Sequence, residues 1–238
     1  MNILMIDVGG SHVKFMNARD GEMRKLKSGT GLNAAEMAEG VIAETSDWSY
    51  DAISIGYPGL LRKGRPVRDP SNLGEGWLNF DFEKAFGRPV RMINDASMQA
   101  LGNYVHGRLL FLGFGTSIGT CVIADDIVIP VEIGMIKFSK KEHFRDRLSK
   151  EALKEGGIKT WQVAVQEAVE LLSDVFQPDD TVLGGGNASL IDPLPAACRL
   201  VNNTSAYVGA ERLWEEADLY ARPDESTWKI IRRENPVA

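Results

Sequence analysis

Short apolar runs alternate along the chain with segments of helical period, and this pattern predicts an α/β fold. Each expected buried strand is an apolar run that ends at glycine, proline or polar residues: 3–6, 52–55, 89–93, 109–114 and 181–183. Each expected helix has apolar residues at helical spacing: 33–44, 81–86, 96–105, 142–155, 161–176, 205–220 and 228–233. Strands mixed with helices in this order favour mixed sheets covered by helices.

The opening pattern of the chain returns farther along. In both copies, at residues 3–27 and 109–131, a strand leads into a glycine turn, a second strand, an acidic turn and a third strand. Such self-similarity indicates a duplicated unit, so we expect two lobes that face each other. We place a small N-terminal lobe at 1–94, completed by a C-terminal helix within 226–238, and a larger lobe at 95–225.

Two glycine-rich turns occupy equivalent places in the two copies. The first contains Gly9, Gly10 and Ser11, and the second contains Gly115, Thr116 and Ser117. Glycine lets backbone N–H groups approach a phosphate closely, and the hydroxyls add donors. Either turn alone could be a hairpin that needs glycine, but two at matched positions favour a phosphate chain held between them. Neither fits a Walker A loop or a dinucleotide motif, because Gly-Lys is absent and no helix follows.

Other candidate residues follow expected strands. Asp7 ends the first strand and could hold Mg²⁺ through water. Asp95 follows the strand at 89–93, and it could deprotonate a hydroxyl or only cap the next helix. A third glycine run, 184–186, could lie against a phosphate or a bulky ligand, or could be a tight turn. Residues 60–79 are expected to form a long loop, and such loops are usually functional.

The composition limits what the chain binds through its overall charge. The 238 residues carry a formal net charge of −6, so there is no general attraction for nucleic acids or anionic membranes. No apolar run approaches the ~20 residues of a membrane helix, and the N-terminus lacks the basic region of a signal peptide. Two cysteines are too few for a zinc site or a disulfide framework, which favours a reducing cytoplasm.

Seven short motifs, taken in order, resemble those of the ROK family of repressors, open reading frames and kinases. They are Asp7-Val8-Gly9-Gly10-Ser11, Pro58-Gly59, Ser71-Asn72-Leu73 with Trp77, Asn94-Asp95-Ala96, the run from Gly113 to Gly119, Glu132-Ile133-Gly134, and Gly184-Gly185-Gly186. The resemblance covers most of the chain. Within the family, the chain is most similar to the compact polyphosphate/ATP glucokinases.

The resemblance implies an actin-like ATPase (ribonuclease H-like) fold, duplicated into two lobes around a central cleft. It implies a kinase that moves a phosphoryl group from ATP or polyphosphate to a hexose hydroxyl, most of all that of glucose, with Asp95 as catalytic base. The sugar ligands would be Gly59, Ser71, Asn72, Asn94 and Glu132. The phosphate and nucleotide ligands would be Asp7, Gly9, Gly10, Ser11, Lys14, Gly115, Thr116, Ser117, Gly184, Gly185 and Gly186. Mg²⁺, the absence of a structural zinc, and a cytoplasmic homodimer without nucleic-acid or membrane partners are also implied.

The chain departs from the family pattern at Met135, where the motif Glu-x-Gly-His has histidine. Methionine cannot donate a hydrogen bond to a sugar. Another sugar or small acceptor therefore stays open beside glucose, as does a non-catalytic sugar sensor. The basic residues Lys140, Lys141, Arg145 and Arg147 are expected to form a solvated helix face, with guidance of a polyphosphate chain as the alternative.

Overall fold

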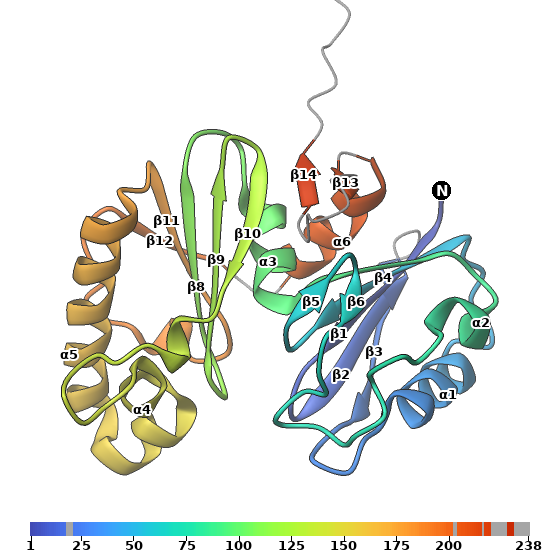
Figure 1. Ribbon diagram of the computed structural model, residues 1–238, viewed down its shortest axis with the longest axis horizontal. Coiled ribbons are helices and arrows are strands. Elements are labelled where there is room, and N and C mark those ends of the chain that lie inside the picture. The colour runs from blue at the N-terminus through green and yellow to red at the C-terminus, as the bar shows by residue number, and fades with distance from the viewer. Residues whose placement is uncertain (18–20, 202–203, 216, 220–227, 231–238) are drawn as a thin grey trace, which may run out of the picture.

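The computed structural model describes residues 1–17, 21–201, 204–215, 217–219 and 228–230, which form two lobes side by side (Figure 1). Each lobe is built on one mixed sheet, and helices cover these sheets. Within the described ranges, no helix has the length and apolar character needed to cross a membrane.

The sheet of the N-terminal lobe has the strand order β3-β2-β1-β4-β7. Its strands are β1 (Ile3–Val8), β2 (His12–Asn17), β3 (Met23–Lys27), β4 (Ala52–Tyr57) and β7 (Val90–Asn94). The first three form an antiparallel meander, and β4 and β7 run parallel to β1. β1 and β4 are buried on both faces, which explains why each is a continuous apolar run.

The second sheet repeats this arrangement and adds two strands at one edge. Its order is β12-β11-β8-β9-β10-β14-β13. Its strands are β8 (Leu109–Phe114), β9 (Ile118–Ala124), β10 (Ile127–Val131), β11 (Asp180–Gly184), β12 (Cys198–Leu200), β13 (Ala217–Leu219) and β14 (Trp228–Ile230). The meander β8-β9-β10 corresponds to β1-β2-β3, and β11 and β12 run parallel to β8. The repeated sequence pattern is therefore a repeated topology.

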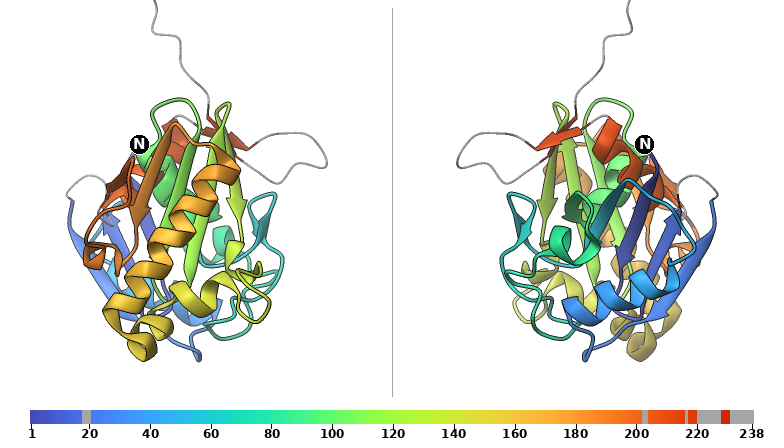
Figure 2. Two further views of the ribbon diagram at one scale, coloured as in Figure 1. Left: turned by 90° about the vertical axis from the view of Figure 1, so that its left-hand side faces the viewer. Right: turned by 90° about the vertical axis from the view of Figure 1, so that its right-hand side faces the viewer.

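The helices cover the outer faces of the sheets and fill the space between them (Figure 2). They are α1 (Ala34–Glu44), α2 (Phe82–Phe86), α3 (Asp95–Asn103), α4 (Phe144–Leu148), α5 (Lys150–Phe176) and α6 (Ser205–Glu215), with 3₁₀ turns η1 (Ile133–Met135) and η2 (Ala188–Leu190). α1 and α5 pack on the outer faces of the first and second sheet, each over its own apolar cluster. α3 and α6 lie in a third cluster that joins residues of both sheets.

The C-terminal part of the chain differs from two predictions. The helix expected at 205–220 ends at Glu215, and Ala217–Leu219 is strand β13. The helix expected at 228–233, within 226–238, is wrong for Trp228–Ile230, which forms β14 and pairs with β10. Buried Trp228 and Ile230 alternate with an exposed residue, which is the period of a strand. Residues 226–227 and 231–238 lie outside the described ranges.

Two further segments differ from their predictions. The helix expected at 142–155 is two helices, because Ser149 ends α4 and its side chain caps α5. α5 then continues through the predicted 161–176, with a break at Gly157 (φ 75°). The loop expected at 60–79 contains a small hairpin of β5 (Leu61–Arg62) and β6 (Arg65–Pro66). The division into lobes at residues 94 and 95 stays a prediction, and we propose it because β7 passes there directly into α3.

Candidate active site

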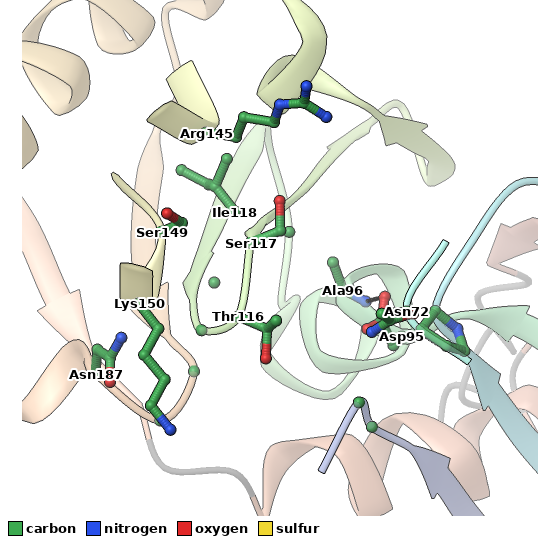
Figure 3. Close-up of a pocket in the computed structure, with 18 of the residues that line it drawn as sticks. Asn72, Asp95, Ala96, Thr116, Ser117, Ile118, Arg145, Ser149, Lys150 and Asn187 are labelled. Carbon is green, nitrogen blue, oxygen red and sulfur yellow. Dashed lines mark hydrogen bonds between the residues drawn. The ribbon is translucent and has the colours of Figure 1, made fainter. Parts of the chain in front are cut away.

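One cavity of about 920 Å³ between the lobes brings together nearly all residues singled out in the sequence. Its lining includes Asp7, Gly9, Gly10, Ser11, Lys14, Gly59, Ser71, Asn72, Asn94, Asp95, Gly115, Thr116, Ser117, Glu132, Gly185 and Gly186. Figure 3 shows Asp95 and Asn72 on one wall and Thr116 and Ser117 on the opposite wall. Residues that lie far apart in the sequence thus face one common space.

Three carboxylates reach the cavity from the ends of three strands. Asp7 lies in β1, Asp95 follows β7 as the first residue of α3, and Glu132 follows β10. Burial above all, together with the negative charges of Asp7 and Glu132, raises the pKa of Asp95 to about 7. The N–H of Ala96 opposes this rise by donating a 2.8 Å hydrogen bond to Asp95 Oδ1. Asp95 therefore exchanges its proton near neutral pH.

The other two carboxylates are shifted in the same direction. Burial raises the pKa of Asp7 and that of Glu132, and the nearby cations Lys14 and Arg68 oppose the respective shifts. The half-buried carboxyl group of Asp7 fits a hard cation, which prefers oxygen ligands. The described residues contain no group of three or more metal-ligating side chains. A magnesium ion bound here would therefore take its remaining ligands from water and phosphate oxygens.

The buried carboxylate of Asp95 is expected to lower the stability of the fold. Its pKa of about 7 exceeds the value of about 3.9 for an unfolded chain, so stability falls as the pH rises from about 4 to 7. Asp95→Asn removes the charge, and we expect its Tm to exceed that of the wild type by several °C at pH 8. The difference should shrink toward zero at pH 4. Thermal unfolding followed by circular dichroism measures both values, and equal Tm values at pH 8 would contradict this electrostatic account.

Two asparagines hold the wall around Asp95. Asn94 Oδ1 accepts a 3.0 Å hydrogen bond from the N–H of Ser97 and so caps α3, while its Nδ2 donates to the carbonyl of Gly59 at 3.4 Å. Asn72 lies directly against the first glycine turn, because a Cβ on Gly10 would be 2.7 Å from Asn72 Nδ2. The sequence left open whether Asp95 only caps the following helix. The structure shows that the cap of α3 is Asn94 rather than Asp95.

Packing and hydrogen bonds of Trp77 fix the loop that carries Asn72. This side chain is fully buried, its backbone N–H donates to Asp69 Oδ1 at 2.7 Å, and its indole N–H donates to the carbonyl of Leu32 at 3.4 Å. Trp77 also packs against Tyr57, at 5.8 Å between ring centroids. Trp77 is therefore a packing residue, and it positions the loop rather than lining the cavity.

The third glycine run is fixed against the second sheet. Gly185 has φ +85°, and a Cβ there would be 2.5 Å from the carbonyl oxygen of Phe114, so only glycine fits. Gly184 does not line the cavity; it lies in β11 beside Gly113, where the ring of Phe111 packs against it. The run leads into the 3₁₀ turn η2. The prediction of Gly184 as a ligand is therefore corrected, whereas Gly185 and Gly186 line the cavity.

Several lining residues were not predicted as ligands from the sequence, among them Gln99, Thr120, Arg145, Ser149, Lys150 and Asn187. Three of them carry buried polar atoms without a hydrogen-bond partner: Gln99 Oε1, Thr120 Oγ1 and Asn187 Nδ2. Buried polar atoms are nearly always paired, so these three mark places where a ligand or water completes the site. The backbone N–H of Lys150 donates to the carbonyl of Gly115 at 2.8 Å, which ties the start of α5 to the second glycine turn.

The basic residues near α4 divide into two groups. Arg147 pairs with Glu167 at 2.9 Å and its guanidinium stacks over the ring of Phe138 at 4.6 Å, so it is a structural surface residue. Lys140 and Lys141 are exposed and lie outside the cavity lining. Lys140 and Lys141 precede α4, so the predicted helix face is wrong for these two residues. Of the two arginines on α4, only Arg145 lines the cavity.

The chain is similar in sequence to known polyphosphate glucokinases, although no family model matches it. The polyphosphate glucokinase of Mycobacterium leprae (strain TN) is 26% identical over 234 residues, which cover 86% of this chain and 72% of the relative. The polyphosphate glucokinase of Mycobacterium tuberculosis (strain CDC 1551 / Oshkosh) is 27% identical over 237 residues, covering 86% and 88%. An N-acetylmannosamine kinase of Vibrio vulnificus (strain CMCP6) is 28% identical over 109 residues, covering 42% and 37%.

Solved structures share the fold. The inorganic polyphosphate/ATP-glucomannokinase of Arthrobacter sp. strain KM superposes with a TM-score of 0.74 at 24% identity, covering 88% of this chain and 96% of that one. A ROK family glucokinase of Streptomyces griseus gives a TM-score of 0.71 at 15% identity, covering 88% and 98%. The chain is thus similar in sequence to the polyphosphate glucokinases and has the two-lobed, actin-like fold of the solved ROK sugar kinases.

Proposed function

We propose that the chain is a sugar kinase that transfers a phosphoryl group from ATP or polyphosphate to a hexose hydroxyl, converting glucose to glucose 6-phosphate. One observation carries the proposal. A single cavity holds a carboxyl that titrates near neutral pH, amide side chains, and two glycine turns from equivalent positions of the two lobes. The polyphosphate glucokinases of the two mycobacteria support this choice of reaction.

The acceptor sugar lies against the wall formed by Asn72, Asn94 and Glu132, with Gly59 and Ser71 beside them. Amide and carboxylate groups offer donors and acceptors to a ligand rich in hydroxyls. Asp95 accepts the proton of the attacking hydroxyl, because its carboxylate is about half ionised at pH 7 and largely ionised above it. The desolvation that raises the pKa of Asp95 also makes its carboxylate a stronger base than an exposed aspartate.

The phosphoryl donor lies between the two glycine turns. The N–H groups of Gly9 and Gly115 close their own turns by donating to the carbonyls of His12 and Ser117. The backbone N–H of Gly10 and the hydroxyls of Ser11, Thr116 and Ser117 would hold the phosphates, and Lys14 would add a positive charge. A magnesium ion held through water by Asp7 would neutralise charge on the phosphates when bound. Phosphoryl transfer requires mainly such positioning and electrostatic stabilisation, so these groups and one base suffice.

The contact between Gly10 and Asn72 links the phosphate wall to the acceptor wall, and it predicts the effect of Gly10→Ala. The added methyl group would lie 2.7 Å from Asn72 Nδ2, so the amide must move. We expect KM for the sugar to rise about tenfold, because one hydrogen bond to a hydroxyl is lost. Steady-state kinetics with the sugar as the varied substrate measures the change. Gly31→Ala is the control, since a Cβ there meets nothing within 4 Å and the residue lies outside the cavity lining.

The proposed function is tested by assaying the wild type with glucose and Mg²⁺, in parallel with ATP and with polyphosphate. Formation of glucose 6-phosphate that is lost in Asp95→Asn supports the proposal and identifies the donor. The absence of product with both donors would contradict it, and would favour another acceptor or a non-catalytic sugar sensor. A direct glucose titration by calorimetry separates those two outcomes, because a sensor would still bind the sugar.

A different acceptor is the second candidate, and Met135 is the observation that favours it. Its side chain is 59% exposed and does not line the cavity, so it offers no hydrogen bond to the sugar. The partial match to an N-acetylmannosamine kinase supports the same possibility. Comparison of kcat/KM for glucose, mannose and N-acetylmannosamine decides between them.

We also propose that the protein is a cytoplasmic homodimer, as the resemblance to the ROK family implies. Exposed Val163, Leu171 and Val175 along α5 give it an apolar surface. Light scattering coupled to size-exclusion chromatography measures the mass, and a value equal to one chain at micromolar concentration would contradict the dimer.

A further inference from the structure

Arg145 is a charged residue of the cavity wall that has no part in the mechanism above. It lies in the first turn of α4, next to the second glycine turn. A Cβ on Gly134 would be 3.6 Å from both Arg145 Cβ and Ser117 Oγ, so the root of the arginine and this hydroxyl are neighbours. In Figure 3 the guanidinium extends away from Ser149, above Ser117, toward the side on which Asp95 and Asn72 lie.

The charge of Arg145 is not used by a strong ion pair. Its Nη1 lies 3.5 Å from Met135 Sδ, a weak acceptor, and its Nε is 3.6 Å from Asp146 Oδ1. Asp146 already accepts a 2.8 Å hydrogen bond from the N–H of His143 and lies 3.1 Å from its ring. Exposed pairs of this kind contribute little. Arg147, two residues along, is by contrast fixed by Glu167.

We propose that Arg145 is a catalytic residue that binds the phosphoryl group as it passes from the donor to the acceptor. This inference rests on the proposed kinase function. The sugar oxygen forms a bond to phosphorus, the bond to the bridging oxygen of the donor breaks, its electron pair leaves with the donor, and the proton goes to Asp95. Negative charge on the transferring oxygens needs a partner on the face opposite the first lobe.

Arginine suits this role because its planar fork can bind two phosphoryl oxygens at once and stays charged at every working pH. The hydroxyls of Thr116 and Ser117 would hold the same phosphate from its donor side. The contact between Arg145 Nη1 and Met135 Sδ is consistent with this role. A thioether supports the arginine side chain without competing for its charge, whereas a carboxylate at that position would bind it.

The kinetic test compares Arg145→Gln, Arg145→Lys and the control Lys141→Gln, which removes the same charge from an exposed site outside the cavity. At saturating sugar and donor, we expect kcat of Arg145→Gln to fall at least about 10²-fold. Arg145→Lys should keep part of the activity and Lys141→Gln should equal the wild type. Free guanidinium ion should restore part of the rate of Arg145→Ala. A kcat for Arg145→Gln within threefold of the wild type, or a rise in sugar KM alone, would overturn the proposal.

A binding measurement keeps the inference separate from the proposed function. Tripolyphosphate with Mg²⁺ is titrated by calorimetry into the same variants, which requires no turnover. If the wild type phosphorylates no sugar, the proposed function fails. The titration still tests whether Arg145 binds phosphate, because it does not depend on turnover. An affinity about tenfold weaker in Arg145→Gln, with Lys141→Gln unchanged, supports a phosphate contact. Equal affinities in an inactive protein would overturn it.

Discussion

Asp95→Asn is expected to lower kcat for sugar phosphorylation by about 10²- to 10⁴-fold. The amide has the size of the carboxyl group but cannot take a proton from the attacking hydroxyl. Its carbonyl can still accept the hydrogen bond that the N–H of Ala96 donates at 2.8 Å, so the start of α3 should not move. The Asn94 cap of α3 is also untouched. The loss should therefore appear in kcat, with KM for the sugar changed little.

The measurement is the steady-state rate at saturating sugar and donor, with Asp174→Asn as the matched control. Asp174 is an exposed aspartate of α5 outside the cavity lining, so its variant removes an equal charge without touching the site. The control should match the wild type. Full activity of the Asp95→Asn enzyme would show that Asp95 is not the catalytic base.

The pKa of Asp95 also fixes the direction of the pH dependence. The carboxyl binds its proton below a pH of about 7 and is then unable to act as a base. We expect kcat/KM to rise about tenfold per pH unit below 7 and to level off above it, because this ratio reports groups of the free enzyme. A profile that is flat from pH 5.5 to 8 would contradict the buried, charge-coupled environment of Asp95.

The repeated meander and the location of the site could be predicted from the sequence because both depend on local signals. Glycine turns at matched positions, and the short acidic turn at Asp125 and Asp126, fix where strands begin and end. Since both copies fold alike, their glycine turns must face one cleft. The position of Asp95 at a strand end follows from the same logic.

The features that could not be predicted depend on contacts between distant segments. The short segment with Trp228 and Ile230 has no sequence pattern that distinguishes a helix from a strand. It forms β14 because it pairs with the edge of β10. Arg145 looked like its neighbour Arg147, because sequence spacing does not show that α4 turns one arginine into the cavity and the other toward Glu167. Gly184 was misjudged for a similar reason, since the ring that packs against it lies on another strand.

The crossing of α3 and α6 predicts the largest loss of stability. A Cβ on Gly102 would lie 1.9 Å from the carbonyl oxygen of Ser205, and one on Gly209 would lie 1.8 Å from that of Met98, so the two backbones touch. We expect Gly102→Ala and Gly209→Ala each to lower the unfolding free energy by about 3 kcal/mol and Tm by roughly 6–12 °C, because neither backbone can yield without moving a helix.

Gly156→Ala is the control. It is also a helical glycine, but its Cβ would meet Thr160 at an ordinary 3.6 Å, so it should be neutral or stabilising. Thermal unfolding of the three variants measures the effect, and a Gly102→Ala protein as stable as the wild type would show that the helices separate easily. Because α3 begins at Asp95, the same displacement should lower kcat well below the unfolding temperature.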